Sequence, residues 1–226
     1  MRVLESVVVG LALAVVVAGA VLGVLVTPPV TRTLVRWLDV AASGGLSPAQ
    51  AESLAEDTRL FVTDRSAPPL PAQVGGMPAF DGAAVAHLED VRELLLAARL
   101  ATGVLAGLLA VWLVVSVARR RMPAIASALF AGALCCAVLP VVGAVLAFSD
   151  FEWFFSAFHA VFFEAGTWTF PSDALLIRLF PEPFWASVGA LWAGGIVLGG
   201  VMLGAAALGV RSAGGARPAV PRGEDA

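Results

Sequence analysis

Long apolar stretches alternate with more polar segments along this chain of 226 residues. A bilayer core of roughly 30 Å is crossed by about 20 apolar residues in a helix. Four stretches reach that length: Val7–Val26, Leu94–Val117, Ile125–Phe148 and Trp185–Val210, the second interrupted only by Arg99. The pattern therefore predicts an all-α integral membrane protein with four transmembrane helices.

Three of the four runs contain residues that predict further features of the spans. Residues 18–20 of the first run, Ala-Gly-Ala, resemble a signal-peptide cleavage site, but the run exceeds the usual ~7–15 apolar residues, so we expect it to be retained. Pro140 predicts a kink in the third run. Glycine pairs at 194–195 and 199–200 in the fourth run favour close helix packing.

Composition agrees with a membrane protein. Hydrophobic residues make up 59% of the chain and charged residues 14%, and the mean hydropathy is +0.90. The net charge is −3 and lysine is absent, so we expect no nucleic-acid partner. The two cysteines, Cys135 and Cys136, are adjacent inside an apolar run, which indicates packing residues and no disulfide framework.

Charge placement predicts the orientation of the spans. Three arginines at 119–121 form a tight turn, and three more lie in the tail 211–226, so both should be cytoplasmic. The segments 28–93 and 149–184 are acidic and should face outward. The predicted division is helices at 1–27, 94–118, 125–148 and 185–210, a cytoplasmic turn at 119–124, an extracellular cap at 28–93, an extracellular aromatic-rich segment at 149–184 and a disordered tail at 211–226.

The first outward segment is too long for a bare loop and should be a small cap with structure of its own. Ser47 and Gln50 have the spacing of a capping box, with Pro48 at the first helical position, which predicts a helix ending near Asp64. From Asp81 the chain again reads as a helix that continues into the second span.

His87 lies in this last helix. At about 1.5 Å per residue it stands roughly 10 Å before Leu94, just above the membrane surface. Asp90, three residues on, shares a helix face with the imidazole, and we expect its carboxylate to orient the ring and leave the other nitrogen for chemistry. A surface histidine in a charged helix is the plainer alternative.

The second outward segment is rich in phenylalanine. Phe148–Trp185 contains ten of the 13 phenylalanines, and the chain has no tyrosine. Its middle holds His159, which as a helical residue has Phe155, Phe162 and Phe163 on its face. Burial there would keep the imidazole neutral, as a general base requires. An interfacial aromatic belt is the alternative, but a pocket for an apolar substrate fits so many phenylalanines better.

Several kinds of site can be compared with these residues. Neither the GxSxG elbow of serine hydrolases nor the HExxH motif of zinc enzymes occurs, and we expect no cofactor. A metal site from His87, Asp90, His159 and Glu164 stays open, as does a non-catalytic module that binds lipid or protein through its phenylalanines. Two histidines acting as acid and base on an acyl group is the sharper hypothesis.

Two blocks of sequence resemble a known bacterial membrane family, that of the lipoprotein intramolecular transacylase. One block is His87-Leu88-Glu89-Asp90-Val91-Arg92. The other contains Phe158-His159-Ala160-Val161-Phe162-Phe163, Trp168-Thr169-Phe170, Asp173, Leu176-Ile177, Leu179-Phe180-Pro181-Glu182 and Phe184-Trp185.

The resemblance implies an acyltransferase with four spans, an extracellular cap and two catalytic histidines, matched here by His87 and His159. Such enzymes move the sn-2 acyl chain of a diacylglyceryl-modified lipoprotein to the α-amino group of its own N-terminal cysteine, which gives a lyso-form lipoprotein. It also implies the bacterial cytoplasmic membrane, with the site where the cap meets the membrane; the placement of the arginines predicts that both termini are cytoplasmic and that this site faces outward. The expected partners are the lipoprotein substrate and membrane lipid; no oligomeric state is predicted.

This reaction closes an eight-membered ring, so an aromatic pocket that orients both ends would supply much of the rate. We expect His159 to be the base, because its apolar setting favours the neutral form, and His87 beside Asp90 to be more readily cationic and to act on the oxyanion or leaving group. The expected substrate-binding residues are Phe155, Phe158, Phe162, Phe163, Trp168, Phe170 and Trp185.

Overall fold

The computed structural model describes residues 2–215, and they are mostly helical. The elements in chain order are α1 (Arg2–Leu25), α2 (Pro28–Trp37), α3 (Val40–Gly44), α4 (Pro48–Thr63), β1 (Gln73–Val74), β2 (Met77–Pro78), α5 (Gly82–Ala118), α6 (Met122–Ser149), α7 (Phe151–Phe162), α8 (Leu175–Leu179) and α9 (Glu182–Gly215). The two short strands pair antiparallel as a hairpin.

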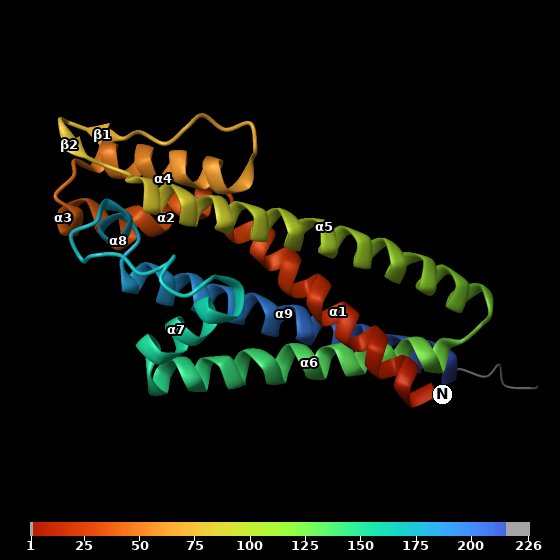
Figure 1. Ribbon diagram of the computed structural model, residues 1–226. Helices are drawn as coiled ribbons and strands as arrows, with labels where there is room; N and C mark the ends of the chain where they lie inside the picture. Colours follow the sequence, from red (N-terminus) through yellow and green to blue (C-terminus); the bar gives the residue numbers. More distant parts are fainter. Residues whose placement is uncertain (1, 216–226) are drawn as a thin grey trace, which may run out of the picture.

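Four helices, α1, α5, α6 and α9, are each long and apolar enough to cross a membrane. They contain the four predicted spans except for Val26, which follows the end of α1. α6 packs along both α9 and α1, whereas α5 contacts α1 and only slightly contacts α6. α5 and α6 are joined by the turn at Arg119–Arg121 and diverge toward the opposite end of the molecule (Figure 1). The predicted fold class is confirmed.

Small residues let these helices approach closely. A methyl group on Gly10 of α1 would lie 2.6 Å from the Cβ of Ala131 on α6, and one on Gly200 of α9 would lie 2.8 Å from the Cβ of Cys136. Cys136 is fully buried at this contact. Gly194 has open space around it, so only part of the predicted glycine surface of the fourth span lies in an interface.

The cap is built from α2, α3, α4, α8 and the hairpin, together with the first turns of α5 and α9. Ser47 forms the predicted capping box: its side chain accepts from the Gln50 backbone N–H, and its own N–H donates to the Gln50 side chain. Asp81 begins α5 by accepting from the Ala84 N–H at 2.8 Å. One apolar core joins these elements, and its largest members include Leu34, Val40, Leu54, Phe61, Phe80, Leu88, Leu179, Phe180 and Phe184.

Some boundaries differ from the sequence-based ones. α6 already begins at Met122, with Pro123 in its first turn, so the turn is shorter than 119–124. Pro140 lies inside α6 without ending it. α9 continues to Gly215, past the expected end of the fourth span. Of the predicted tail, residues 216–226, with Arg217 and Arg222, lie outside the described residues.

Candidate active site

Two histidines from different helices lie together at the cap end of the molecule. His87 is on the second turn of α5, and His159 is on the last turn of α7. The centroids of their rings are 6.2 Å apart. Residues separated widely in sequence therefore form one pair, which is the first requirement for acid–base chemistry that uses two groups.

The pairing depends on a sharp change of direction at Asp150. The backbone there is extended, so α6 ends; the Asp150 carboxylate then accepts from the Trp153 N–H at 2.9 Å and begins α7. α7 turns back from the end of α6, as Figure 1 shows. This brings His159 back toward the first turns of α5.

Aromatic rings surround His159. The rings of Phe155, Trp168, Phe158 and Phe163 have centroids 4.0, 4.9, 5.6 and 5.6 Å from its own. Such apolar neighbours remove water from the imidazole, and this burial lowers the pKa of His159 below its ordinary value of 6.5. The ring is therefore neutral at neutral pH, as expected from the sequence.

One hydrogen bond selects the tautomer of His159. Its Nδ1 lies 2.7 Å from the backbone carbonyl oxygen of Phe155, one turn earlier. A carbonyl only accepts, so the proton of the neutral ring is on Nδ1 and Nε2 carries the lone pair. The same hydrogen bond raises the pKa of His159, but burial lowers that pKa by more. Nε2 is thus available as a base.

His87 is more deeply buried than the sequence suggested, with 8% of its surface exposed. It precedes Leu94, where the span predicted from the sequence begins, and burial, followed by the proximity of His159, lowers its pKa below 6.5. Asp90 raises that pKa, but by less. Because burial exceeds the attraction of the carboxylate, His87 is neutral at neutral pH, as His159 is; that His87 is the more readily cationic of the two stays a prediction.

The family comparison extends over most of the chain. The model of the family described as "Lipoprotein intramolecular transacylase Lit" matches residues 6–185, which include both histidines and the aromatic segment. The chain belongs to this transacylase family. It is accordingly an enzyme of the membrane, a lipoprotein intramolecular transacylase.

Solved structures agree with the family in fold. The membrane-integral transacylase from Bacillus cereus superposes with a TM-score of 0.77 at 16% identity, over 95% of this chain and 97% of that one. Structures of the Bacillus cereus protein with one histidine replaced by arginine or alanine give TM-scores of 0.76 at 12% identity. They cover 95% of this chain and 93% and 95% of theirs. No curated protein sequence matches the chain significantly.

The structure of this family member brings most of the predicted binding residues together. Phe163 is the central one, because its ring lies 5.0 Å from that of His87 as well as near His159. Phe170 lies 5.6 Å from His87. Sequence spacing alone did not single out Phe163, since its helix had to be placed against α5 first.

Two of the expected residues lie outside this group. The Phe162 ring contacts those of Phe158 and Phe163 and is otherwise exposed. Trp185 packs against Phe180 and Phe184, in the cap core. Their binding of substrate stays a prediction.

Asp90 makes no hydrogen bond with His87 in the described part of the chain. Its side chain is exposed, and the Nδ1 of His87 is buried without a partner. Orientation of the imidazole by Asp90 is thus limited to charge. Within residues 2–215, no three His, Cys, Asp or Glu side chains are grouped as a metal ion would need. The geometry therefore gives no support to a metal centre that includes Asp90 and Glu164.

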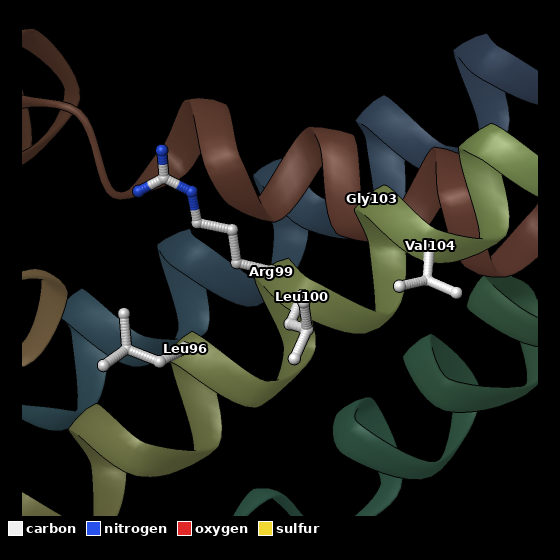
Figure 2. A pocket seen from close by; sticks show the side chains of 5 residues that line it. All are labelled: Leu96, Arg99, Leu100, Gly103 and Val104. Carbon is white, nitrogen blue, oxygen red and sulfur yellow. The ribbon is translucent and has the colours of Figure 1, made fainter.

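A shallow pocket of the transacylase lies away from the histidines, on the apolar span of α5. Figure 2 shows its lining residues following one another along that helix: Leu96, Arg99, Leu100, Gly103 and Val104. Leu100 is 70% exposed and Val104 53%. These are values expected for a surface that faces lipid, so this pocket is not part of the histidine site.

Proposed function

We propose that the protein moves the sn-2 acyl chain of a diacylglyceryl-modified lipoprotein to the α-amino group of the same lipoprotein's N-terminal cysteine. The product is an N-acylated lipoprotein with a single acyl chain left on the glyceryl group. The observation that carries the proposal is the buried pair His87 and His159, with Nε2 of His159 free to accept a proton. Membership of the transacylase family supports the same reaction.

In the proposed step, the cysteine nitrogen attacks the carbonyl carbon of the sn-2 ester. His159 Nε2 accepts the proton that the nitrogen loses. The bond between the carbonyl carbon and the sn-2 oxygen then breaks, and His159 returns the proton to that oxygen. An ester is exchanged for an amide and a hydroxyl group, with no co-reactant.

His87 has a supporting part in this scheme. Its lowered pKa makes it a neutral donor of one N–H. An ester group placed between the two rings, whose centroids are 6.2 Å apart, would reach a nitrogen of each. His87 would then donate a hydrogen bond to the sn-2 oxygen as the bond breaks. This replaces the cationic role that the sequence favoured.

The aromatic rings contribute by orientation. The transfer passes through an eight-membered ring, which an unbound lipid rarely adopts. Holding the acyl chain against Phe155, Phe163 and Phe170 while the amine meets His159 makes the encounter intramolecular within a fixed pocket, which can remove several kcal/mol of the barrier. Exposed apolar rings on α7, including Phe158 and Phe162, offer the chain a route in from the lipid.

The site is proposed to face outward. The turn Arg119–Arg121 lies at the opposite end of the molecule from the cap (Figure 1), and clustered arginines favour the cytoplasmic side. In chains with Cys135 and Cys136 replaced by alanine, Ser66→Cys should react with an impermeant maleimide in intact cells, and Arg120→Cys should not. The reverse labelling would contradict this orientation.

Mass spectrometry of lipoprotein N-termini tests the function. A bacterial host without N-acylating enzymes would express the wild type, His87→Ala or His159→Ala. N-acyl, monoacylglyceryl peptides should appear with the wild type alone. If all strains keep diacylglyceryl peptides while the wild type is well expressed, the transfer is refuted, and a module that only binds lipid becomes the better explanation.

A further inference from the structure

Trp168 has an unsatisfied donor beside the proposed base. It lies in the segment between α7 and α8, and the centroid of its ring is 4.9 Å from that of His159. Its indole nitrogen Nε1 is buried and has no hydrogen-bond partner. Buried polar groups in native proteins are nearly always paired, so an unpaired one requires an explanation.

The other tryptophans of the chain provide an internal comparison. Trp112 and Trp192 are also partly buried, and each has a partner: the Nε1–H of Trp112 donates to Glu5 at 3.0 Å, and that of Trp192 donates to the Ala18 carbonyl at 2.9 Å. Trp37, Trp153 and Trp185 are 74%, 55% and 43% exposed. Within residues 2–215, only Trp168 has a buried indole N–H without an acceptor.

The chemistry of indole restricts what the acceptor can be. An indole N–H donates and never accepts, so it recognises an oxygen with a free lone pair. We propose that Trp168 Nε1–H donates to the carbonyl oxygen of the scissile sn-2 ester and to the oxyanion that this oxygen becomes. This rests on the function proposed above and adds a catalytic residue to it.

The arrangement of the three polar groups supports this assignment. The ring of His159 has Trp168 and His87 as neighbours. While His159 serves the attacking amine and His87 the leaving oxygen, the carbonyl oxygen still needs a donor. A fixed donor in a dry site stabilises developing charge strongly, because no water competes for it.

Substrate entry must uncover the nitrogen. The segment 163–174 has no helix and turns at Gly166, whose φ is +88. An ester that enters beside Phe155, whose ring centroid is 6.5 Å from that of the indole, would accept the hydrogen bond from the N–H. The closed arrangement thus keeps the donor dry until substrate arrives.

The test replaces indole by phenyl, which removes the N–H and keeps an aromatic ring. With a synthetic diacylglyceryl-cysteine peptide in vesicles, Trp168→Phe should lower kcat about 100-fold, the order found for loss of one oxyanion donor, with a smaller change in KM. Trp153→Phe, on α7 and not among the expected binding residues, should stay within about twofold of wild type. Wild-type kcat in Trp168→Phe would overturn the inference while leaving the proposed function intact; no product from wild type and this control would refute the function instead.

A second readout does not depend on turnover. In a ¹⁵N-indole NMR spectrum, the signal absent from Trp168→Phe identifies Trp168. The N-acetylated form of the peptide retains the ester but cannot attack it. Its binding should shift the Trp168 N–H proton downfield as the hydrogen bond forms. Binding that leaves this signal unmoved, while signals of other residues change, would overturn the inference even if the variant folds poorly.

Discussion

The Nδ1–H of His159 donates to the backbone carbonyl oxygen of Phe155 at 2.7 Å. This one bond orients the imidazole from within its own helix and leaves Nε2 as its accepting nitrogen. Orientation of a catalytic histidine often falls to a carboxylate. Here a helical carbonyl takes that place, which suits a pocket where a buried charge would be costly.

Replacement of His159 by glutamine should abolish transfer. The Gln amide can still donate to the Phe155 carbonyl, so local structure is preserved, but it cannot take a proton from the amine. We expect turnover to fall by about 10²–10⁴-fold, the usual contribution of a general base. Mass spectrometry of a lipopeptide substrate measures this. A variant that retains more than a tenth of wild-type turnover would contradict the role of His159.

The pH dependence of activity should report the ionisation of His159. Burial lowers the pKa of His159 below 6.5, and the base works in its neutral form. As pH falls, kcat/KM should therefore decline in two steps: the attacking α-amino group of the substrate, whose ordinary pKa is about 7.7–8.0, becomes protonated first, and His159 follows with a midpoint below 6.5. A pH profile of the wild type without the second step below 6.5 would show that the working base is a different group or that the pocket is wet.

The same burial links stability to pH. The folded state disfavours protonation of His87 and His159, whereas the unfolded chain binds protons near pH 6.5. The stabilising effect is therefore complete above that pH and is lost as pH falls toward the lowered folded values. The midpoint of thermal unfolding in detergent should therefore fall as pH is lowered below about 6.5, and it should fall less in His87→Gln. An equal fall in both proteins would show that His87 is not one of the groups responsible.

The lengths of the apolar runs were sufficient to predict the outline of the fold, because transmembrane helices need long apolar runs. The capping box at Ser47 and the start of α5 at Asp81 could also be predicted, since a helix cap depends only on residues within one turn of the helix end. The core of the cap could not be predicted, because α2, α3 and α8 are short helices that are held in place by contacts between residues distant in sequence. The same limit applies to the burial of His87: its local neighbour Asp90 could be seen in the sequence, whereas the rings of Phe163 and Phe170 come from elsewhere in the chain.

Replacing the charged side chain of Asp90 by a neutral one should have little effect on turnover. The carboxylate is exposed and raises the pKa of His87 less than burial lowers it. Asp90→Asn should leave the imidazole neutral and turnover within about threefold of wild type, like the neighbouring control Glu89→Gln. A loss as large as that of His87→Ala would show that Asp90 contacts the ring during the reaction, as the sequence had led us to expect.

Close helix contact can be tested with a pair of glycines on α1. An added methyl at Gly10 would meet the backbone nitrogen of Gly132 at 2.8 Å as well as Ala131, and backbone cannot easily move aside. At Gly23 nothing lies within 4 Å. Gly10→Ala should destabilise the protein by about 1–3 kcal/mol through overpacking, whereas Gly23→Ala should be neutral or slightly stabilising. Thermal unfolding of both in one detergent would check this; equal midpoints would mean that α1 and α6 are farther apart.

Two adjacent phenylalanines at the end of α7 have different surroundings: Phe163 lies against the two histidines, and Phe162 lies at the surface. The Phe163 ring lies 5.0 and 5.6 Å from those of His87 and His159, whereas Phe162 is 48% exposed and contacts neither. Phe163→Leu should allow the two histidines to shift and water to enter, so we expect turnover to fall by about 10–100-fold, because small misplacements of catalytic groups have effects of this size. Phe162→Leu removes the same ring from the lipid-facing side. It should mainly raise KM, since only the approach of the acyl chain is affected. If the two variants have equal kcat, ring contact with both histidines does not position them, and the aromatic segment serves only to bind lipid.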